Sequence, residues 1–375
     1  MPAYPVPMRY KRIFALIAWL AAISSQAQEN NAGMVKEGDL FLNFRNISFV
    51  RNNEYSNPIT EGYTLIGWFI QPELVYRPVK KAEIRLGAHL LSFSGTNRFS
   101  LAKPVFSTTW FLSDHTRFTI GSLQGSDSHK MLDPHFSREK TFTNFSEDGL
   151  QLVSRSQRIF SDTWVSWENY IFRGDNEREI FTAGESFIYT PTKESSLISL
   201  EIPVQLMFKH YGGQISDYPE PVETFLNLSA GAKALLMINR EKNLSTGLEA
   251  HGFYGNSMRE NASSGVDKGH AFWLKAVGTF SKAEIEAGYW ISRDYYAPDG
   301  NFIYGSVSDH LSNVVLSPRK LITGCINFKS SRIGPLEFNL GIEGWYDTSL
   351  ERFDNAVTLH LQIDELVKLV TVKRQ

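Results

Sequence analysis

Hydrophobic side chains recur at every second residue in many short segments of this chain. The segment AEIEAGYWISR, at 283–293, alternates apolar residues with glutamates, glycine and serine, and LEFNLGIEGW, at 336–345, does the same. A helix would bring apolar residues back every 3.6 positions, so a period of two predicts β-strands with one apolar and one polar face. Further segments with this period are 82–90, 225–235 and 357–364.

The segments between the predicted strands alternate strictly between short and long. Bacterial outer-membrane barrels have an even number of strands, short periplasmic turns and longer extracellular loops. We therefore predict an all-β fold, a transmembrane antiparallel β-barrel of about 16 strands, with 14 or 18 as alternatives. The predicted strands are 39–50, 62–77, 81–94, 102–113, 115–124, 149–159, 163–172, 179–191, 197–211, 224–238, 243–254, 269–280, 283–294, 315–328, 335–346 and 356–371, with a tight turn expected near 160–162.

The polar face of these strands carries ionised groups that a packed sandwich core would not accept without partners. In a barrel this face lines the lumen, where it forms either a solvated wall or, because acids outnumber bases, a mild filter for cations and neutral solutes. The residues assigned to it are Glu83, Arg85, His89, Lys233, Glu249, His251, Glu284, Glu286, Glu337 and Glu343. Outward aromatic residues expected to form girdles at the membrane interfaces are Phe44, Phe69, Phe208, Tyr254, Tyr289 and Phe338.

The N-terminal segment 1–27 reads as a cleaved signal peptide. Basic residues precede the apolar run IFALIAWLAAI, and small residues follow at Ser25 and Ala27. The apolar run is shorter than the roughly 20 residues that a membrane-spanning helix needs. We therefore expect residues 28–375 to form one barrel domain that is exported to the bacterial outer membrane.

Composition supports an exported barrel and excludes some function classes. Cys325 is the only cysteine, so no disulfide forms within the chain. The net charge of −2 gives no electrostatic basis for nucleic-acid binding. Aromatic residues make up 13% of the chain although its mean hydropathy is −0.24, as expected when strands alternate apolar and polar residues. No phosphate-binding glycine motif is present, and no cofactor is predicted.

The longest predicted loop, GSDSHKMLDPHFSREKTFTNFSED at 125–148, is the third long connection. General porins fold such a loop into the lumen as a constriction, so solute contact is one interpretation and an ordinary extracellular loop is the other. A metal site is a weaker alternative, because the spacing of the acidic and histidine residues matches no tight ligand motif. These residues are Asp127, His129, Asp133, His135 and Glu139.

The segment DTWVSWENYIFRGDNEREIFTAGES, at 162–186, contains two glutamates, Glu168 and Glu179, that could be taken for a catalytic carboxylate pair flanked by tryptophans. Alternation instead predicts a hairpin in which Trp164, Glu168 and Tyr170 face the lumen. Pairing across the loop places Glu168 near Thr182, whereas Glu179 lies near the rim on the opposite face. A glycosidase pair needs two carboxyl groups that converge on one face, so this interpretation is rejected.

Four sequence blocks resemble a family of uncharacterised, porin-like outer-membrane proteins of the Bacteroidetes. They are GSLQGSDSHKMLDPHF (121–136), EDGLQL (147–152), the hairpin block within 162–186 and PVQLMFKHYGGQISD (203–217). In that family the fourth block tends to read HRGGQID, so Tyr211 stands where the family has an arginine. The resemblance implies an outer-membrane barrel and provides no catalytic residues.

These observations favour a channel for the diffusion of small hydrophilic solutes, and we do not expect an enzyme. No G-x-S-x-G motif is present, and the histidines are scattered. The alternative is a barrel enzyme or surface-binding protein with a loop-plugged lumen, acting on lipid, lipopolysaccharide or glycan. Expected partners are outer-membrane lipid, lipopolysaccharide and small hydrophilic solutes. The sequence leaves undecided whether the protein forms a homo-oligomer. The candidate lumen or constriction residues are Arg85, Asp127, His129, Asp133, His135, Trp164, Glu168, Tyr170, Lys233, Glu284, Glu286, Trp290 and Glu343.

Overall fold

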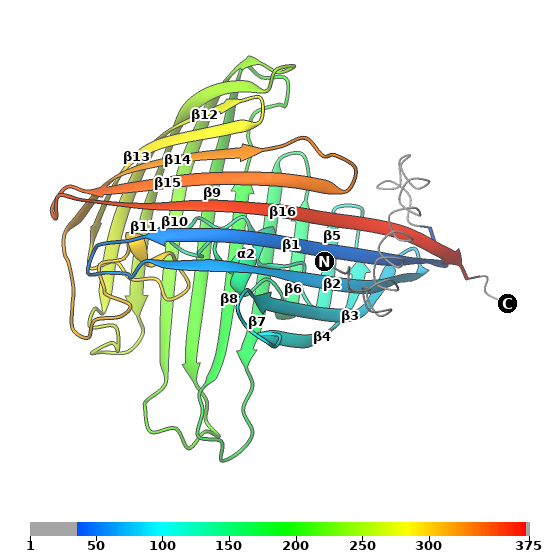
Figure 1. Ribbon diagram of the computed structural model, residues 1–375, viewed down its shortest axis with the longest axis horizontal. Coiled ribbons are helices and arrows are strands. Elements are labelled where there is room, and N and C mark those ends of the chain that lie inside the picture. The colour runs from blue at the N-terminus through cyan, green and yellow to red at the C-terminus, as the bar shows by residue number, and fades with distance from the viewer. Residues whose placement is uncertain (1–35, 373–375) are drawn as a thin grey trace, which may run out of the picture.

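The computed structural model describes residues 36–372, so the predicted signal peptide lies outside the described residues. The chain forms one closed antiparallel barrel in which every strand pairs with its neighbours in sequence and β1 pairs with β16 (Figure 1). The strands are β1 (Asp39–Glu54), β2 (Tyr63–Val79), β3 (Ala82–Phe93), β4 (Leu101–Phe111), β5 (Thr116–Ser122), β6 (Asp148–Arg155), β7 (Ile159–Asn169), β8 (Glu179–Tyr189), β9 (Ile198–Gly212), β10 (Glu223–Asn239), β11 (Leu244–Ser257), β12 (Lys268–Phe280), β13 (Ala283–Arg293), β14 (Arg319–Lys329), β15 (Leu336–Asp347) and β16 (Arg352–Thr371).

The predicted fold class and strand number are confirmed. Loop lengths alternate as predicted from β1 to β15, but the last connection, 348–351, is shorter than the turn at 330–335 before it. Along β12, buried and exposed residues alternate almost throughout, with Trp273 and Lys275 facing inward and Phe272 and Leu274 facing outward. None of the helices within residues 36–372 is long and apolar enough to cross a membrane.

Two details of the predicted strands are wrong. The turn between β6 and β7 lies at 156–158 and not at 160–162, because the Ser156 hydroxyl accepts hydrogen bonds from the backbone N–H groups of Arg158 and Ile159. Phe69 faces inward and is fully buried rather than part of an outer girdle. The ring stacks on Phe145, whose loop enters the lumen and supplies an apolar partner there.

Two long connections fold into the lumen and cross it. The first connection, 123–147 between β5 and β6, contains the short helices η2 (Ser126–His129) and α2 (Lys140–Thr143). The second connection, 294–318 between β13 and β14, contains η3 (Phe302–Tyr304). They contact each other where the Ser137 N–H donates to the Asp299 carbonyl oxygen and the Asn301 amide donates to Asp133. Hydrogen bonds therefore join the two long connections to each other inside the barrel.

His129 anchors the first of these loops to the barrel wall. Its imidazole lies between two carboxylates, with Nε2 2.8 Å from Glu147 and Nδ1 3.0 Å from Asp162 of β7. The ring is fully buried and stacks on Trp164 with centroids 3.7 Å apart. Burial lowers the pKa of His129, but the hydrogen bonds that the ring donates to Asp162 and Glu147 outweigh this effect and raise the pKa to about 9. The anchor is therefore an imidazolium held by two carboxylates.

The Trp164 indole is in turn seated on a glycine of the neighbouring strand. Gly184 of β8 lies opposite Trp164, and a Cβ atom at position 184 would lie 2.4 Å from the indole carbons Cη2 and Cζ2. A larger residue at this position would push the indole away from His129.

We expect Gly184→Ala to lower the free energy of unfolding by about 1–3 kcal/mol, the usual effect of overpacking a filled interior. Thermal or denaturant unfolding in detergent measures it. Gly252→Ala is the matched control, because a Cβ there meets no atom within 4 Å and the strand is equally regular. Equal stability of the two variants would show that Trp164 is free to move.

We also expect the stabilisation from His129 to depend on pH. The folded pKa of about 9 lies above the ordinary value of 6.5, so proton binding stabilises the fold. The contribution is complete below pH 6.5 and is lost as the pH rises through 9, with a total on the order of 3 kcal/mol. The measurement compares the unfolding midpoints of wild type and His129→Gln between pH 6 and pH 10. A gap between the two proteins that stays constant over this range would contradict the anchor.

Candidate functional site

A row of side chains crosses the outward face of four neighbouring strands close to the end that carries the long loops. Register places Trp167 of β7 opposite Phe181 of β8, Phe181 opposite His210 of β9, and His210 opposite Thr224 of β10. Each of these residues has the outward parity of its strand, since the alternate residues Thr182 and Lys209 are buried on the inside. By analogy with bacterial barrels, the long loops mark the extracellular rim.

His210 and Thr224 form the chemically distinctive pair of this row. The imidazole Nδ1 lies 2.8 Å from the Thr224 hydroxyl, which is hydrogen-bonding distance. The other flank of the imidazole is covered by Phe181, stacked at 4.7 Å, and Phe181 stacks on Trp167 at 5.0 Å. The ring is therefore fixed by aromatic stacking on one side and by the hydroxyl on the other. A histidine within reach of a hydroxyl can take its proton and so make the oxygen nucleophilic.

Glu179 is the carboxylate of the same patch. It lies opposite Gly212, two positions from the Phe181–His210 pair on the same outward face, so its Cβ is roughly 7 Å from that of His210. Its Oε1 accepts a hydrogen bond of 3.1 Å from the Trp167 indole. The carboxylate is thus held beside the imidazole, where it would stabilise a transient positive charge on the ring.

Apolar side chains surround this pair on the outside of the barrel. Leu226 and Leu228 are the next two outward residues of β10 after Thr224, and Leu228 is exposed. Met258 and Val222 are exposed just beyond the strand ends. The backbone N–H of Met258 donates to the Thr224 carbonyl oxygen. A polar acid–base pair thus lies at the upper edge of a surface suited to hydrocarbon chains.

The other histidines that contact carboxylates lack this geometry. Both nitrogens of His129 are occupied by carboxylates, and His251 of β11 is buried with Nε2 on Glu249. His310 contacts Asp309 and Ser308 through the same nitrogen, Nδ1, so it cannot relay a proton between them. Burial lowers the pKa of His135 to about 3 and keeps that ring neutral.

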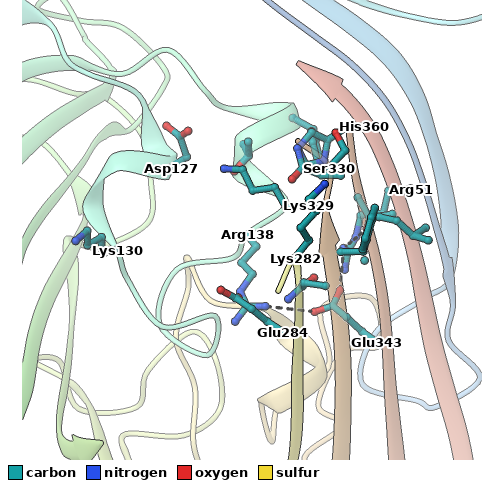
Figure 2. A pocket seen from close by; sticks show the side chains of 18 of the residues that line it. Arg51, Asp127, Lys130, Arg138, Lys282, Glu284, Lys329, Ser330, Glu343 and His360 are labelled. Atoms are coloured by element: carbon teal, nitrogen blue, oxygen red, sulfur yellow. Dashed lines mark hydrogen bonds and ion pairs between the residues drawn. The ribbon is translucent and has the colours of Figure 1, made fainter. Parts of the chain in front are cut away.

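The lumen beneath the loops contains two sizeable cavities. The larger, about 690 Å³, reaches from the first loop to the short turns at 281–282 and 330–331. Figure 2 shows Arg138 projecting from that loop towards Glu284 and Glu343, with Lys282 and Lys329 nearby. Arg138 is 3.9 Å from Glu343, which also pairs with Arg51 at 3.0 Å. The second cavity, about 420 Å³, is lined by the polar wall of β1 to β5.

A buried ion cluster holds the two loops against β7, β8 and β9. Lys209 of β9 contacts Glu168 at 2.6 Å and Asp299 of the second loop at 3.1 Å. Asp299 also pairs with Lys140 of the first loop and accepts a hydrogen bond from Thr182. Burial alone would raise the pKa of Asp299, but the two lysines hold it well below its ordinary value. The carboxylate is therefore ionised and joins both loops to the wall.

Most of the other residues predicted to line the lumen are placed inside the barrel. Asp127 borders both cavities, and Glu284 borders the larger one. Arg85 pairs with Glu83 and Glu73 of the wall. Asp133 accepts a hydrogen bond from Asn301, and Glu286 pairs with Lys275. Lys233 lies opposite Glu201 and Glu249 in the register of the wall, and Glu343 pairs with Arg51 and Arg138 as described above.

Three aromatic residues proposed to contact solute do not face a cavity. Trp164 and Trp290 are buried, at 1% and 0% exposure, because the loops cover them. Trp290 packs against Tyr295 and Tyr304 of the second loop. Tyr170 lies beyond the end of β7 and is 66% exposed, because a register shift between Trp167 and Asn169 ends the regular alternation.

The loop residues weighed as metal ligands do not converge. Asp127 borders the cavities, His129 is held by carboxylates, and His135 lies between Phe253 and Tyr295. Among residues 36–372, no three histidine, cysteine, aspartate or glutamate side chains are arranged to hold a metal ion.

Sequence analysis missed the His210–Thr224 pair although it placed both strands well. The two residues are 14 positions apart and meet only through the register of β9 and β10. If the predicted strands 197–211 and 224–238 are paired residue by residue from their facing ends, His210 falls opposite residue 225 and not opposite Thr224. An error of one residue in register reverses the face of every side chain. The available signal was a histidine and a threonine near the facing ends of neighbouring strands.

The fold is that of known outer-membrane proteins. The chain is similar to OccK8 (OprE) of Pseudomonas aeruginosa, with 12% identity, a TM-score of 0.52 and coverage of 88% of this chain and 99% of that one. It is also similar to a loop L8 deletion mutant of OmpT, an outer membrane protein of Vibrio cholerae, with 10% identity, a TM-score of 0.51 and coverage of 87% and 99%. At these identities the likeness concerns the fold alone. No curated protein sequence matches the chain.

A family match corrects the expectation that this chain is not an enzyme. The model of a family described as lipid A 3'-O-deacylase-type matches residues 27–372, almost the whole chain. This description points to an enzyme, so the expectation of a protein without catalytic activity is wrong. The resemblance to an outer-membrane barrel family is confirmed, whereas its assignment to the Bacteroidetes stays a prediction. The chain belongs to the lipid A 3'-O-deacylase-type family.

Proposed function

We propose that the protein is an outer-membrane hydrolase that removes an acyl chain from lipid A, with the Thr224–His210 pair as its catalytic centre. The observation that carries this proposal is the 2.8 Å contact between His210 Nδ1 and the Thr224 hydroxyl on the outward face of the rim. Lipid A lies in the outer leaflet, with its sugars at the interface and its acyl chains beneath them. Its ester bonds therefore meet the barrel at the height of this pair.

The reaction follows from the geometry. His210 accepts the hydroxyl proton as the Thr224 oxygen attacks the ester carbonyl, and Glu179 stabilises the resulting imidazolium. The bond between the carbonyl carbon and the sugar oxygen then breaks, and the imidazolium gives its proton to that oxygen, so the sugar leaves as an alcohol and an acyl-threonine remains. Water, deprotonated by the same imidazole, releases the fatty acid and restores Thr224. The neighbouring Leu226 and Leu228 support the acyl chain on the outer wall.

The resemblance stated for the fourth sequence block supports the choice of His210. The block contains His210 in the order HYGGQIS, where the resembled family tends to read HRGGQID. Tyr211 follows on the inner face, with the guanidinium of Arg178 5.3 Å above its ring. A guanidinium from the neighbouring loop thus lies close to where that family carries its arginine.

We expect His210→Gln to lower the rate of acyl release from lipid A micelles by about 10²- to 10⁴-fold, the usual contribution of a general base. Thr224→Val should have a comparable effect, whereas Thr224→Ser keeps the nucleophile and retains activity. Mass spectrometry of the released fatty acid measures the rate. His115→Gln, in a periplasmic turn, is the control. Wild-type protein that releases no fatty acid, or a fully active His210→Gln variant, would overturn the proposal.

A channel for small hydrophilic solutes is a second candidate, favoured by the charged cavities of 690 and 420 Å³ in the lumen. Export by the predicted signal peptide and residence in the outer membrane suit both functions. The two functions use different surfaces of one barrel, since the acid–base pair faces outward. In the described conformation both loops cross the lumen, so transport would require them to move.

We expect Asp299→Asn to raise the conductance of the barrel in planar bilayers several-fold, because the neutral side chain no longer joins Lys209 and Lys140. Wild-type protein should show a small or intermittent current. Glu260→Gln, an exposed extracellular carboxylate, is the control for the loss of one charge. No conductance in wild type or variant would exclude the channel function and leave the hydrolase proposal unaffected.

A further inference from the structure

A cationic patch lies on the outward face of the rim, over β12, β13 and β14. Lys268, Arg293 and Lys320 are each the outward residue nearest to the long-loop end of their strand. Register places Arg293 directly opposite His270, two positions from Lys268, and Ile291 opposite Lys320. Arg293 is therefore a diagonal neighbour of both lysines, with Cβ atoms about 7–8 Å apart in each pair, whereas Lys268 and Lys320 lie two strands apart on either side of it.

Burial confirms that these side chains point outward. Lys268 and Arg293 are exposed and Lys320 is partly exposed, whereas the residues next to them, Ser292 and Arg319, are fully buried. Within residues 36–372, no hydrogen bond or ion pair involves the three side-chain charges. The three charges are thus not part of a salt-bridge network, although Asp267 and Asp294 are the chain neighbours of Lys268 and Arg293.

The residues beneath the patch are apolar on all three strands. After Lys268 and His270, the outward positions of β12 are Phe272, Leu274 and Ala276. After Lys320, those of β14 are Ile322, Gly324, Ile326 and Phe328. Before Arg293, those of β13 are Ile285, Ala287, Tyr289 and Ile291. On each of the three strands the cation is thus followed, on the same outward face, by apolar or small residues, after His270 in the case of β12.

The rest of the rim does not carry this pattern. The corresponding outward positions of β1 and β8 are the acidic Glu54 and Glu179, and those of β2, β3 and β11 are the uncharged Thr64, Ser92 and Asn256. Cations concentrated over three adjacent strands, directly above an apolar band, match a ligand that is anionic at the interface and hydrocarbon below it. In the outer leaflet that description fits a phosphorylated glycolipid.

We infer that Lys268, Arg293 and Lys320 form a binding site for the phosphate groups of lipid A in the outer leaflet. Ammonium and guanidinium groups bind phosphate oxygens through charge-assisted hydrogen bonds. The acyl chains of the bound lipid lie along Phe272, Tyr289 and Ile322. This site is separate from the His210–Thr224 pair and does not rest on the proposed hydrolysis.

The experiment measures lipid binding by native mass spectrometry of the full-length protein in detergent, with a chelator present to prevent bridging by divalent cations. We expect wild type to bind bis-phosphorylated lipid A and to bind its dephosphorylated form far more weakly. The variant Lys268→Gln/Arg293→Gln/Lys320→Gln should bind the bis-phosphorylated form about 100-fold more weakly, since each basic residue near an anionic surface contributes about fivefold in affinity. The single variant Arg293→Gln should lose part of this affinity. It replaces the triple variant in the experiment if the triple variant does not fold.

The matched control removes three positive charges at the opposite end of the barrel. Lys80, Lys81 and Lys242 lie exposed in the short turns, so Lys80→Gln/Lys81→Gln/Lys242→Gln should bind lipid A like wild type. Inorganic pyrophosphate is the third probe, and it should compete only weakly because it lacks the acyl chains. Equal binding by the rim variant and wild type, an equal loss in the turn variant, or equal binding of dephosphorylated lipid A would each overturn the inference. Competition by pyrophosphate at the same affinity as lipid A would show a free-phosphate site instead of a lipid site.

Discussion

The closed hydrogen-bond ladder of the barrel wall is the constraint on which the rest of the structure depends. In hydrocarbon every backbone N–H and C=O group needs a partner within the protein, and only a sheet closed on itself provides partners for all strands. Here β1 and β16 close the sheet along the whole length of β1, from Asp39 to Glu54. Closure requires one face of every strand to meet lipid and the other to meet the lumen. Chemistry is thereby confined to two places, the interior and the interfacial rims.

The interior is occupied by loops, and charge holds them there. A barrel wall of this size has an inner surface too polar to collapse on itself, so the loops at 123–147 and 294–318 supply complementary groups. Asp299 between Lys140 and Lys209 and His129 between Glu147 and Asp162 are buried ion clusters. Such clusters add little net stability compared with apolar packing, but removing one partner leaves an uncompensated buried charge. They therefore specify one loop arrangement, which accounts for a lumen of separate cavities rather than an open tube.

The sequence predicted those features that depend on local alternation. Strands such as 283–294 agree with β13 to within a residue, because each residue's face is set by its immediate neighbours. Phe69 and Tyr170 were misplaced for non-local reasons. Phe69 turns inward because Phe145 arrives from a loop 76 positions away, and Tyr170 leaves the wall because of a register shift at Glu168. The His210–Thr224 pair was missed for the same kind of reason, since it exists only through the register of two strands.

The rim combines two different surfaces, and their separation limits how they can cooperate. Thr224 lies on β10 and Arg293 on β13, three strand spacings apart, which is about 20 Å around a wall of tilted strands. A disaccharide headgroup is shorter than this distance. One lipid A molecule with its ester at Thr224 therefore cannot place a phosphate on Arg293 in the same pose, whereas Lys268 of β12 is only two strand spacings from Thr224, about 13 Å. The patch acts on the surrounding lipid layer, where it holds or gathers glycolipid beside the barrel, and the row from Trp167 to Thr224 acts on the single molecule that reaches it. Binding to the first surface and turnover at the second are consequently separable properties of one rim.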